Sequence, residues 1–260
     1  MDLELKGKTI VVTGGAKGIG AAIIRAAADE GANTIIVDRD EEAARKLESE
    51  LRSAGKKTVA TIVELINADL CRQAIEQASR ASGQIDALIN NAGVNDRVGL
   101  EGGSPADYVA SLERNLLHYY NMAHYALPWL KKSRGAIVNI SSKTAITGQG
   151  GTSGYASSKG AILALTREWA VELLPYGIRV NAVVPAEVMT PLYRQWLSSF
   201  PNPEAKLKSI VGKIPLGQRM TTPEEIASMV VFLISSKASH ITGQHIFVDG
   251  GYVHLDRALS

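Results

Sequence analysis

The chain has 260 residues, 45% of them hydrophobic, and a net charge of +2 at pH 7. A chain of this length can bury a full core, so we expect one α/β domain over residues 1–260. Acidic and basic residues are interspersed, which gives no sign of a nucleic-acid or membrane surface and favours a small-molecule partner. The single cysteine, Cys71, excludes an internal disulfide. The first residues lack the layout of a secretory signal and no apolar run is long enough to span a membrane, so we expect a cytoplasmic protein.

The first element is a β-branched strand at residues 8–13, followed by a glycine turn and an Ala-rich helix to about residue 30. This order predicts a pyrophosphate site, because the first N–H groups of such a helix are unpaired and glycines let the phosphates approach. The glycine spacing, G-x-x-x-G-x-G, differs from the commonest dinucleotide fingerprint. The residues of the turn assigned to the cofactor are Gly14, Lys17, Gly18, Ile19 and Gly20.

A second strand at residues 33–37 ends at Asp38, a little over twenty residues after the first glycine. A carboxylate at this place holds the adenosine ribose hydroxyls and repels a 2′-phosphate, which favours NAD over NADP. Arg39 and Lys17 favour the opposite choice, since either could pair with that phosphate, so NADP stays possible. We expect Arg39 to lie on the adenine or in solvent.

A charged helix at residues 41–54 leads to a third strand at 58–65. Glu64 and Leu65 lie at its end, where a side-chain acceptor and a backbone amide can read the adenine.

A helix from about residue 67 to 82 precedes the fourth strand, 86–89. Ligands of open parallel sheets bind at the carboxyl ends of the strands. The residues expected at this edge after the fourth strand are Asn90, Asn91, Ala92 and Gly93.

A long helical pattern covers residues 105–132, with Asn115 inside its apolar stripe. A buried amide without a partner costs about 1–3 kcal/mol, so Asn115 is either a structural link or part of a proton path. His118 and His124 lack partners at metal-ligand spacing, so we expect surface or packing roles and no metal.

The stretch around Tyr155 carries the chemistry. A buried strand at 136–140 ends beside Ser142, a glycine-rich loop follows, and a helix begins near Tyr155 with Lys159 one turn later. A phenol titrates near 10, so it needs a nearby cation to become a general base at neutral pH. We predict that Lys159 lowers the pKa of Tyr155 and that Ser142 holds the same substrate oxygen.

The last third contains a strand at 177–184 stopped by Pro185, a substrate lid around residues 186–215, a helix opening at 222–225 and a final strand at 243–248. The lid segment is polar and aromatic, as a cover over a substrate should be. The tail, 252–260, is expected to fold back or to reach a neighbouring subunit.

Together these motifs resemble the short-chain dehydrogenase/reductase family over nearly the whole chain. The matching features are TGGAKGIG at residues 13–20, NNAG at 90–93, Asn115, and Ser142 with Tyr155-x-x-x-Lys159. The resemblance implies a single doubly wound, Rossmann-type α/β domain with seven parallel strands flanked by helices, and usually a homotetramer.

The resemblance also implies roles. Tyr155 would be the acid/base, Ser142 would orient the substrate oxygen, Lys159 would lower the phenol pKa and bind the nicotinamide ribose, and Asn115 would order water in a proton relay. Further residues placed at the cofactor are Pro185, Val188 and Thr190.

Two positions depart from the family pattern. Glu64 stands where the family usually has Asp, and Ala186 replaces the Gly that normally follows the proline. The first departure weakens the adenine assignment, and the second stiffens the entry to the lid.

Segments 113–120, 139–145, 185–193 and 250–257 are similar to bacterial L-fucose dehydrogenases of this family. This similarity implies NAD-dependent oxidation of the anomeric carbon of L-fucose or a related aldose to the lactone. A sugar needs several polar partners. Those expected to contact the substrate, besides Ser142 and Tyr155, are Asn95, Lys143, Gln149 and Glu187, with Asp96 and Arg194 nearby.

Two other functions fit less well. A steroid or other secondary alcohol could occupy a pocket lined by Tyr193, Trp196 and Phe200. A non-catalytic regulator that senses NAD would not need Ser142, Tyr155 and Lys159 together.

Overall fold

The computed structural model describes residues 2–255. Within this range the chain forms one sheet of seven parallel strands in the order β3-β2-β1-β4-β5-β6-β7. The predicted doubly wound α/β fold is therefore confirmed. The strands are β1 (Thr9–Thr13), β2 (Asn33–Asp38), β3 (Thr58–Ile62), β4 (Ala87–Asn90), β5 (Ala136–Ile140), β6 (Arg179–Pro185) and β7 (His245–Val248).

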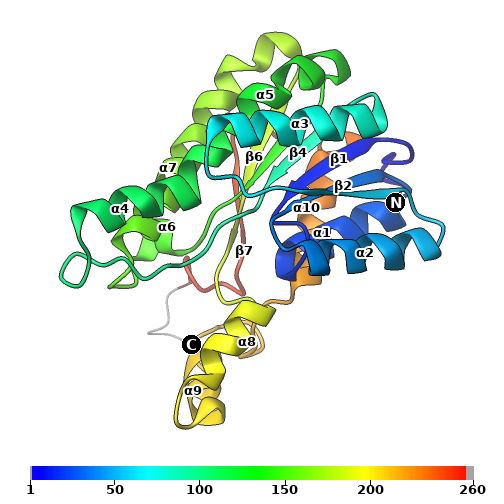
Figure 1. Cartoon of the computed structure of the whole chain (residues 1–260). Coiled ribbons are helices and arrows are strands. Elements are labelled where there is room, and N and C mark those ends of the chain that lie inside the picture. Colours follow the sequence, from blue (N-terminus) through cyan, green and yellow to red (C-terminus); the bar gives the residue numbers. More distant parts are fainter. Residues whose placement is uncertain (1, 256–260) are drawn as a thin grey trace.

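Helices cover both faces of the sheet (Figure 1). On one face lie α1 (Gly18–Asp29), α2 (Glu41–Ser53) and α10 (Pro223–Ile234), which share one apolar core with the sheet. On the other face lie α3 (Ala68–Ser82), α5 (His118–Ser133) and α7 (Ser153–Glu172), with a second core. Because both faces are covered, central strands such as β1 (TIVVT) are buried along their whole length, as their unbroken β-branched runs predict.

The strand order fixes the position of the ligand crevice. β1 pairs with β2 on one side and with β4 on the other, so the connections from these strands diverge at their carboxyl ends. Crevices of doubly wound sheets open at such a switch point. The glycine turn after β1 and the NNAG segment after β4 therefore meet at one edge.

The expected 105–132 helix is interrupted. It consists of α4 (Pro105–Leu112), a π-helical turn (Glu113–Leu117) and α5. The wider turn changes which residues face the sheet, and a strict helical period does not reveal it. Two other helices, α6 (Thr144–Thr147) and α9 (Pro203–Val211), lie where loops or an undivided lid were expected.

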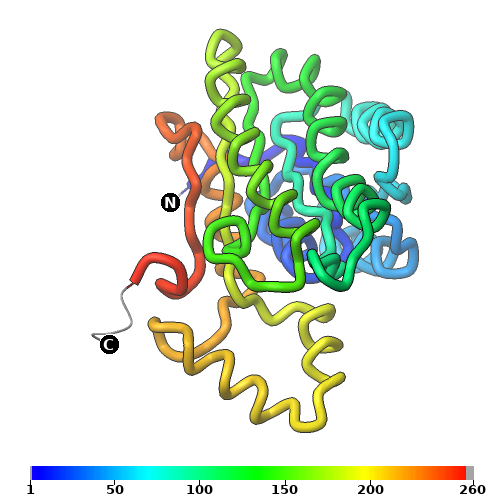
Figure 2. Tube along the Cα trace, turned by 90° about the vertical axis from the view of Figure 1, so that its left-hand side faces the viewer, coloured from blue at the N-terminus to red at the C-terminus, as the bar shows by residue number. Residues whose placement is uncertain are grey.

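The helices α8 (Pro191–Ser198) and α9 project from the body of the molecule (Figures 1 and 2). The turn that follows β7 lies near their base, and Leu216 N–H donates to the Gly250 carbonyl at 2.9 Å. Residues 256–260, the end of the tail expected to fold back, lie outside the described residues. Among residues 2–255 no helix is long and apolar enough to cross a bilayer.

Candidate active site

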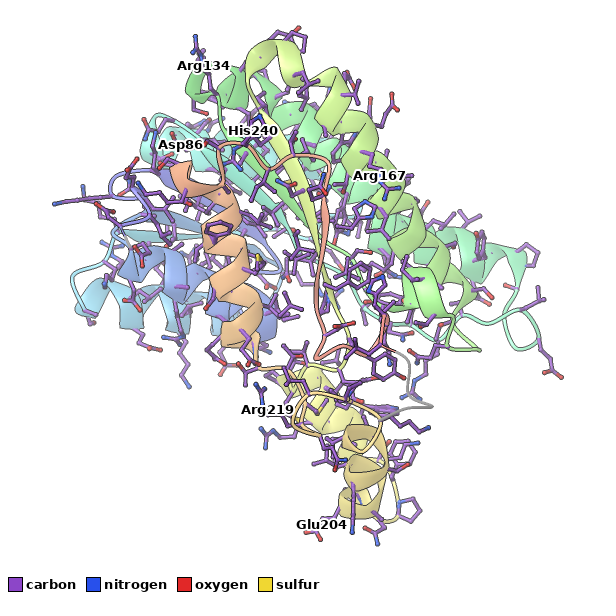
Figure 3. All side chains as sticks on the ribbon, turned by 180° about the vertical axis from the view of Figure 1, so that it is seen from behind. Asp86, Arg134, Arg167, Glu204, Arg219 and His240 are labelled. Atoms are coloured by element: carbon purple, nitrogen blue, oxygen red, sulfur yellow. The ribbon has the colours of Figure 1, made fainter. Side chains whose placement is uncertain are left out.

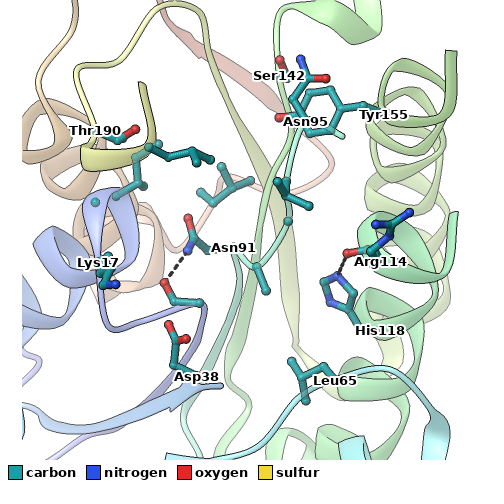
Figure 4. A pocket seen from close by; sticks show the side chains of 18 of the residues that line it. Lys17, Asp38, Leu65, Asn91, Asn95, Arg114, His118, Ser142, Tyr155 and Thr190 are labelled. Atoms are coloured by element: carbon teal, nitrogen blue, oxygen red, sulfur yellow. Dashed lines mark hydrogen bonds between the residues drawn. The ribbon is translucent and has the colours of Figure 1, made fainter. Parts of the chain in front are cut away.

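A cleft of about 660 Å³ opens at the carboxyl edge of the sheet (Figure 4). Most of the residues predicted to hold a cofactor line it. They are Gly14, Lys17, Gly18, Ile19, Asp38, Arg39, Glu64, Leu65, Asn91, Ala92, Gly93, Tyr155, Lys159, Pro185, Val188 and Thr190.

The amino end of α1 is open toward this cleft. Its N-cap residue, Lys17, makes no side-chain cap hydrogen bond, whereas Asp40 and Asn67 cap α2 and α3. The first N–H groups of α1 are thus available to an anion such as a pyrophosphate. Gly20 does not line the cleft, because it packs on the glycine turn, where an added Cβ would lie 2.0 Å from the Gly14 oxygen. These features fit a dinucleotide.

Asp38 is fixed by backbone donors. Its two carboxylate oxygens accept from Ala16 N and Asp40 N, each at 3.0 Å. The two cations expected to compete for a phosphate both have carboxylate partners instead. Lys17 pairs with Asp40, and Arg39 Nη1 lies 2.6 Å from Glu64 Oε1. The expected adenine reader Glu64 is therefore bound to Arg39, and Arg39 is exposed to solvent, as expected, but paired with a carboxylate.

Asn91 holds the turn after β4 against the turn after β1. Its Nδ2 donates to the carbonyls of Thr13 and Gly14 at 3.0 Å, and Thr13 Oγ1 accepts from the backbone N–H of Asn91 at 2.9 Å. Asn90 was expected in the cleft but points into the sheet, where its Nδ2 donates to Asn139 Oδ1 at 3.0 Å. The reason is position: Asn90 is still part of β4, and only Asn91 has left the strand.

Asn115 lies in the π-helical turn and is fully buried. Its Oδ1 accepts from Val94 N at 2.8 Å and its Nδ2 donates to the Ser111 carbonyl at 3.1 Å. Both ends of the amide are thus used to join the helix to the loop after β4. Asn115 does not line the cleft, and its expected role in a proton relay stays a prediction.

Ser142 and Tyr155 meet at the substrate end of the cleft, near Asn95 in Figure 4. Ser142 Oγ accepts from the backbone N–H and the hydroxyl of Thr144, at 3.2 and 3.1 Å. Its own hydroxyl proton is then free to be donated, and Ser142 makes a hydrogen bond that lowers the pKa of Tyr155. Thr144 therefore sets the direction of the Ser142 hydroxyl.

The prediction that Lys159 brings the pKa of Tyr155 down is wrong for this arrangement. Burial outweighs the hydrogen bond from Ser142 and raises the pKa of Tyr155 to about 12. Burial also lowers the pKa of Lys159 to about 7. Lys159 Nζ donates to Tyr119 Oη and the Ile140 carbonyl, both at 2.9 Å, and lies 5.5 Å from the centroid of the Tyr155 ring.

Of the residues expected to contact the substrate, Asn95 lines the cleft with Ser142 and Tyr155. Lys143 and Glu187 lie behind the lining and form an ion pair with each other. Gln149 is exposed on the loop after α6.

Two cleft residues, His118 and Arg114, go beyond the sites assigned from sequence, whereas Asp96 and Tyr193 were expected near a substrate. His118, expected on the surface or in packing, is buried and lines the cleft together with Asp96, Arg114 and Tyr193. The His118 Nε2 contacts the Arg114 carbonyl at 3.0 Å, the contact drawn in Figure 4. A signal existed, since His118 follows Asn115 by less than one helical turn.

Comparison with known proteins agrees with this geometry. A family model described as enoyl-(acyl carrier protein) reductase matches residues 14–253. An L-fucose dehydrogenase of Bos taurus is 37% identical over 252 residues, which cover 96% of this chain and 91% of the relative. The chain belongs to the short-chain dehydrogenase/reductase family. It is therefore an oxidoreductase that uses a nicotinamide cofactor and acts on a small molecule.

Solved structures give the same family. A structure described as Cj0485 dehydrogenase is 48% identical, has a TM-score of 0.95 and covers 100% of this chain and 99% of its own. The aldohexose dehydrogenase of Thermoplasma acidophilum, in ligand-free form, is 32% identical, with a TM-score of 0.87 and coverage of 99% and 98%.

The relatives do not share one substrate. The predicted similarity to L-fucose dehydrogenases is confirmed, here with a mammalian relative where the sequence indicated bacterial ones. A 3-oxoacyl-[acyl-carrier-protein] reductase of Thermotoga maritima is 35% identical over 252 residues, 96% of this chain and 100% of the relative.

Proposed function

We propose that this member of the family is an NAD-dependent sugar dehydrogenase that oxidises the anomeric hydroxyl of L-fucose or a related aldose to the lactone. The observation that carries the proposal is the hydrogen bond between Ser142 and Tyr155 at the wall of a cleft that fits a dinucleotide. The relatives named L-fucose dehydrogenase and aldohexose dehydrogenase support a sugar.

In the proposed reaction, Tyr155 accepts the proton of the substrate hydroxyl and Ser142 holds the same oxygen. The bound nicotinamide supplies the hydride acceptor. Burial raises the pKa of Tyr155, and Lys159, one helical turn away, opposes this effect when protonated because an ammonium favours the phenolate. The N–H groups at the start of α1 hold the pyrophosphate, and Asp38 holds the adenosine ribose.

The choice of NAD is supported by the charges around Asp38. A 2′-phosphate would meet this carboxylate, and the nearby cations Lys17 and Arg39 are already paired with Asp40 and Glu64. Binding NADP would require breaking one of these pairs.

A second candidate is the oxidation of an apolar secondary alcohol. Tyr193, Trp196 and Phe200 stack edge to face, with ring centroids 5.0 and 4.9 Å apart, and Tyr193 lines the cleft. Against this candidate, buried charges lie directly behind the lining near Ser142.

The test follows NADH absorbance with L-fucose, other aldoses and a hydroxysteroid, each with NAD and with NADP. We expect the highest kcat/KM with an aldose and NAD. Tyr155→Phe should lower kcat by about 10²–10⁴-fold, the usual contribution of a general base, while the NADH dissociation constant measured by fluorescence stays unchanged.

A matched control is Tyr108→Phe. Tyr108 donates to Ser157 Oγ at 3.0 Å on the outside of α7 and does not line the cleft, so its variant should keep full activity. Equal activity of wild type and Tyr155→Phe would end the proposal, and preference for the hydroxysteroid would favour the second candidate.

A further inference from the structure

A cluster of polar and aromatic side chains, one of them buried and three half-buried, lies beside Ser142. Its members are Lys143, Glu187, Tyr193 and Tyr252, here called the Lys143 cluster. The Lys143 ammonium pairs with the Glu187 carboxylate, and only 9% and 14% of the two side chains are exposed. Lys143 Nζ lies 4.0 Å from the centroid of the Tyr252 ring, and Tyr193 is hydrogen-bonded to Glu187.

The four members come from four separate segments. Lys143 follows β5, Glu187 follows β6, Tyr193 belongs to α8 and Tyr252 follows β7. Their convergence therefore depends on the whole C-terminal half of the sheet.

Backbone contacts fix the cluster. Lys143 N–H donates to the Pro185 carbonyl at 2.9 Å, which joins the loops after β5 and β6. The Asp249 carboxylate accepts from Gly251 N and Val253 N, at 2.8 and 2.9 Å, and so holds the turn that carries Tyr252.

The cluster forms the wall of the cleft at its substrate end. Ser142 directly precedes Lys143, Ala186 and Val188 flank Glu187, and all three neighbours line the cleft. Tyr193 lines the cleft itself, with Glu187 behind it.

A buried ion pair contributes little net stability, since apolar residues of similar volume would pack as well or better. The ion pair does, however, provide hydrogen-bond donors and acceptors beside the cleft. A carboxylate offers about four acceptor sites, of which Lys143 and Tyr193 occupy two, and an ammonium has three donors. A polyol needs such partners, because each of its hydroxyls is costly to bury unpaired.

We infer that the Lys143 cluster is the specificity subsite for a polyhydroxylated substrate. Tyr193, which lines the cleft, binds a hydroxyl remote from the carbon being oxidised, and the Glu187 carboxylate orients Tyr193 through their hydrogen bond. Lys143 and Tyr252 in turn position the Glu187 carboxylate. This inference rests on the proposed sugar dehydrogenase function and adds the residues that select the sugar.

The experiment measures KM and kcat for L-fucose and the NADH dissociation constant in Glu187→Gln, Tyr193→Phe and Lys143→Met. We expect the KM for the sugar to rise about 10- to 100-fold, because a hydrogen bond to a charged group is lost, while the NADH constant stays within about twofold. Lys143→Arg retains the charge and should recover part of the loss. A monodeoxy L-fucose that lacks the recognised hydroxyl should be a poor substrate for wild type and should lose nothing further in Glu187→Gln.

The control breaks the Glu4–Lys237 ion pair by Glu4→Gln. Glu4 lines a second cavity together with Asp86, Arg134 and His240, which lie at the opposite end of the molecule from Glu204 at the tip of α9 (Figure 3). This variant should leave both constants unchanged.

An unchanged KM for the sugar in the cluster variants would overturn the subsite inference and leave the proposed function standing. A joint change of the sugar KM and the NADH dissociation constant would do the same, because it indicates a structural role of the cluster. If wild type oxidises a hydroxysteroid and none of the aldoses, the proposed function and the inference both fail.

Discussion

Burial has a larger effect on the charges of the catalytic side chains than their mutual attraction. It raises the pKa of Tyr155 to about 12 and lowers that of Lys159 to about 7. The Lys159 ammonium donates to Tyr119 and the Ile140 carbonyl, neither of which is a full negative charge that would offset its desolvation. Spacing in sequence shows that an amine lies one turn from a phenol, but the pKa depends on which atoms surround both groups.

His118 makes a prediction about acid stability. Burial first, and the nearby Lys159 second, lower the pKa of His118 to about 4, while the bond to the Arg114 carbonyl opposes this. The other neighbour is the uncharged ring of Tyr119, 4.9 Å away between centroids. In the unfolded chain His118 binds a proton below about pH 6.5, whereas in the folded chain it does so only below about pH 4. The free energy of unfolding should therefore fall as the pH drops from 6.5 to 4.

The loss from His118 alone should reach about 3 kcal/mol in the free energy of unfolding at pH 4. Urea unfolding at a series of pH values measures it, and His118→Gln should show a flatter slope over this range than wild type. His124→Gln, at an exposed position on α5, should keep the wild-type slope. Parallel curves for wild type and His118→Gln would contradict the prediction.

Among the elements, α10 begins with a capping box that the sequence announces as Thr222-Pro223-Glu224-Glu225. Thr222 Oγ1 accepts from Glu225 N at 3.2 Å, and the Glu225 carboxylate accepts from Thr222 N at 2.8 Å. Thr222→Ala removes the cap and should lower the free energy of unfolding by about 1 kcal/mol and Tm by about 2–4 °C.

Chemical unfolding and calorimetry check this value. Ser228→Ala, inside the same helix, removes only a hydroxyl that bonds the Glu224 carbonyl, and should change stability by less than about 0.5 kcal/mol. If Thr222→Ala lowered the free energy of unfolding by no more than Ser228→Ala, that is by less than about 0.5 kcal/mol, the cap would not stabilise the helix measurably.

Over the whole molecule, the sequence predicted the features that depend on neighbouring residues in the chain, namely the strands and most helix ends. Buried β-branched runs marked the strands, and Gly, Pro and capping residues marked most helix ends. The pairings Lys17–Asp40, Arg39–Glu64 and Lys143–Glu187 were not predictable, because each joins segments that only the fold brings together. The predicted direction of the Tyr155 pKa shift was wrong for the same reason, since burial depends on how the whole chain folds.

The lid remains a prediction that the distribution of stability can test. Among the described residues, α9 has no buried side chain and α8 has only Leu197, whereas the interior strands are buried throughout. Segments with few buried contacts open with a smaller free energy than the core.

Amide hydrogen exchange in residues 191–211 should therefore be faster than in α10, which packs against α1 in the same apolar core. Saturating NADH should slow exchange in α8 more than in α9, because Pro191, Leu192 and Tyr193 line the cleft. Exchange as slow in α8 and α9 as in α10, measured by mass spectrometry on the free enzyme, would show that this segment is a fixed part of the domain and not a lid.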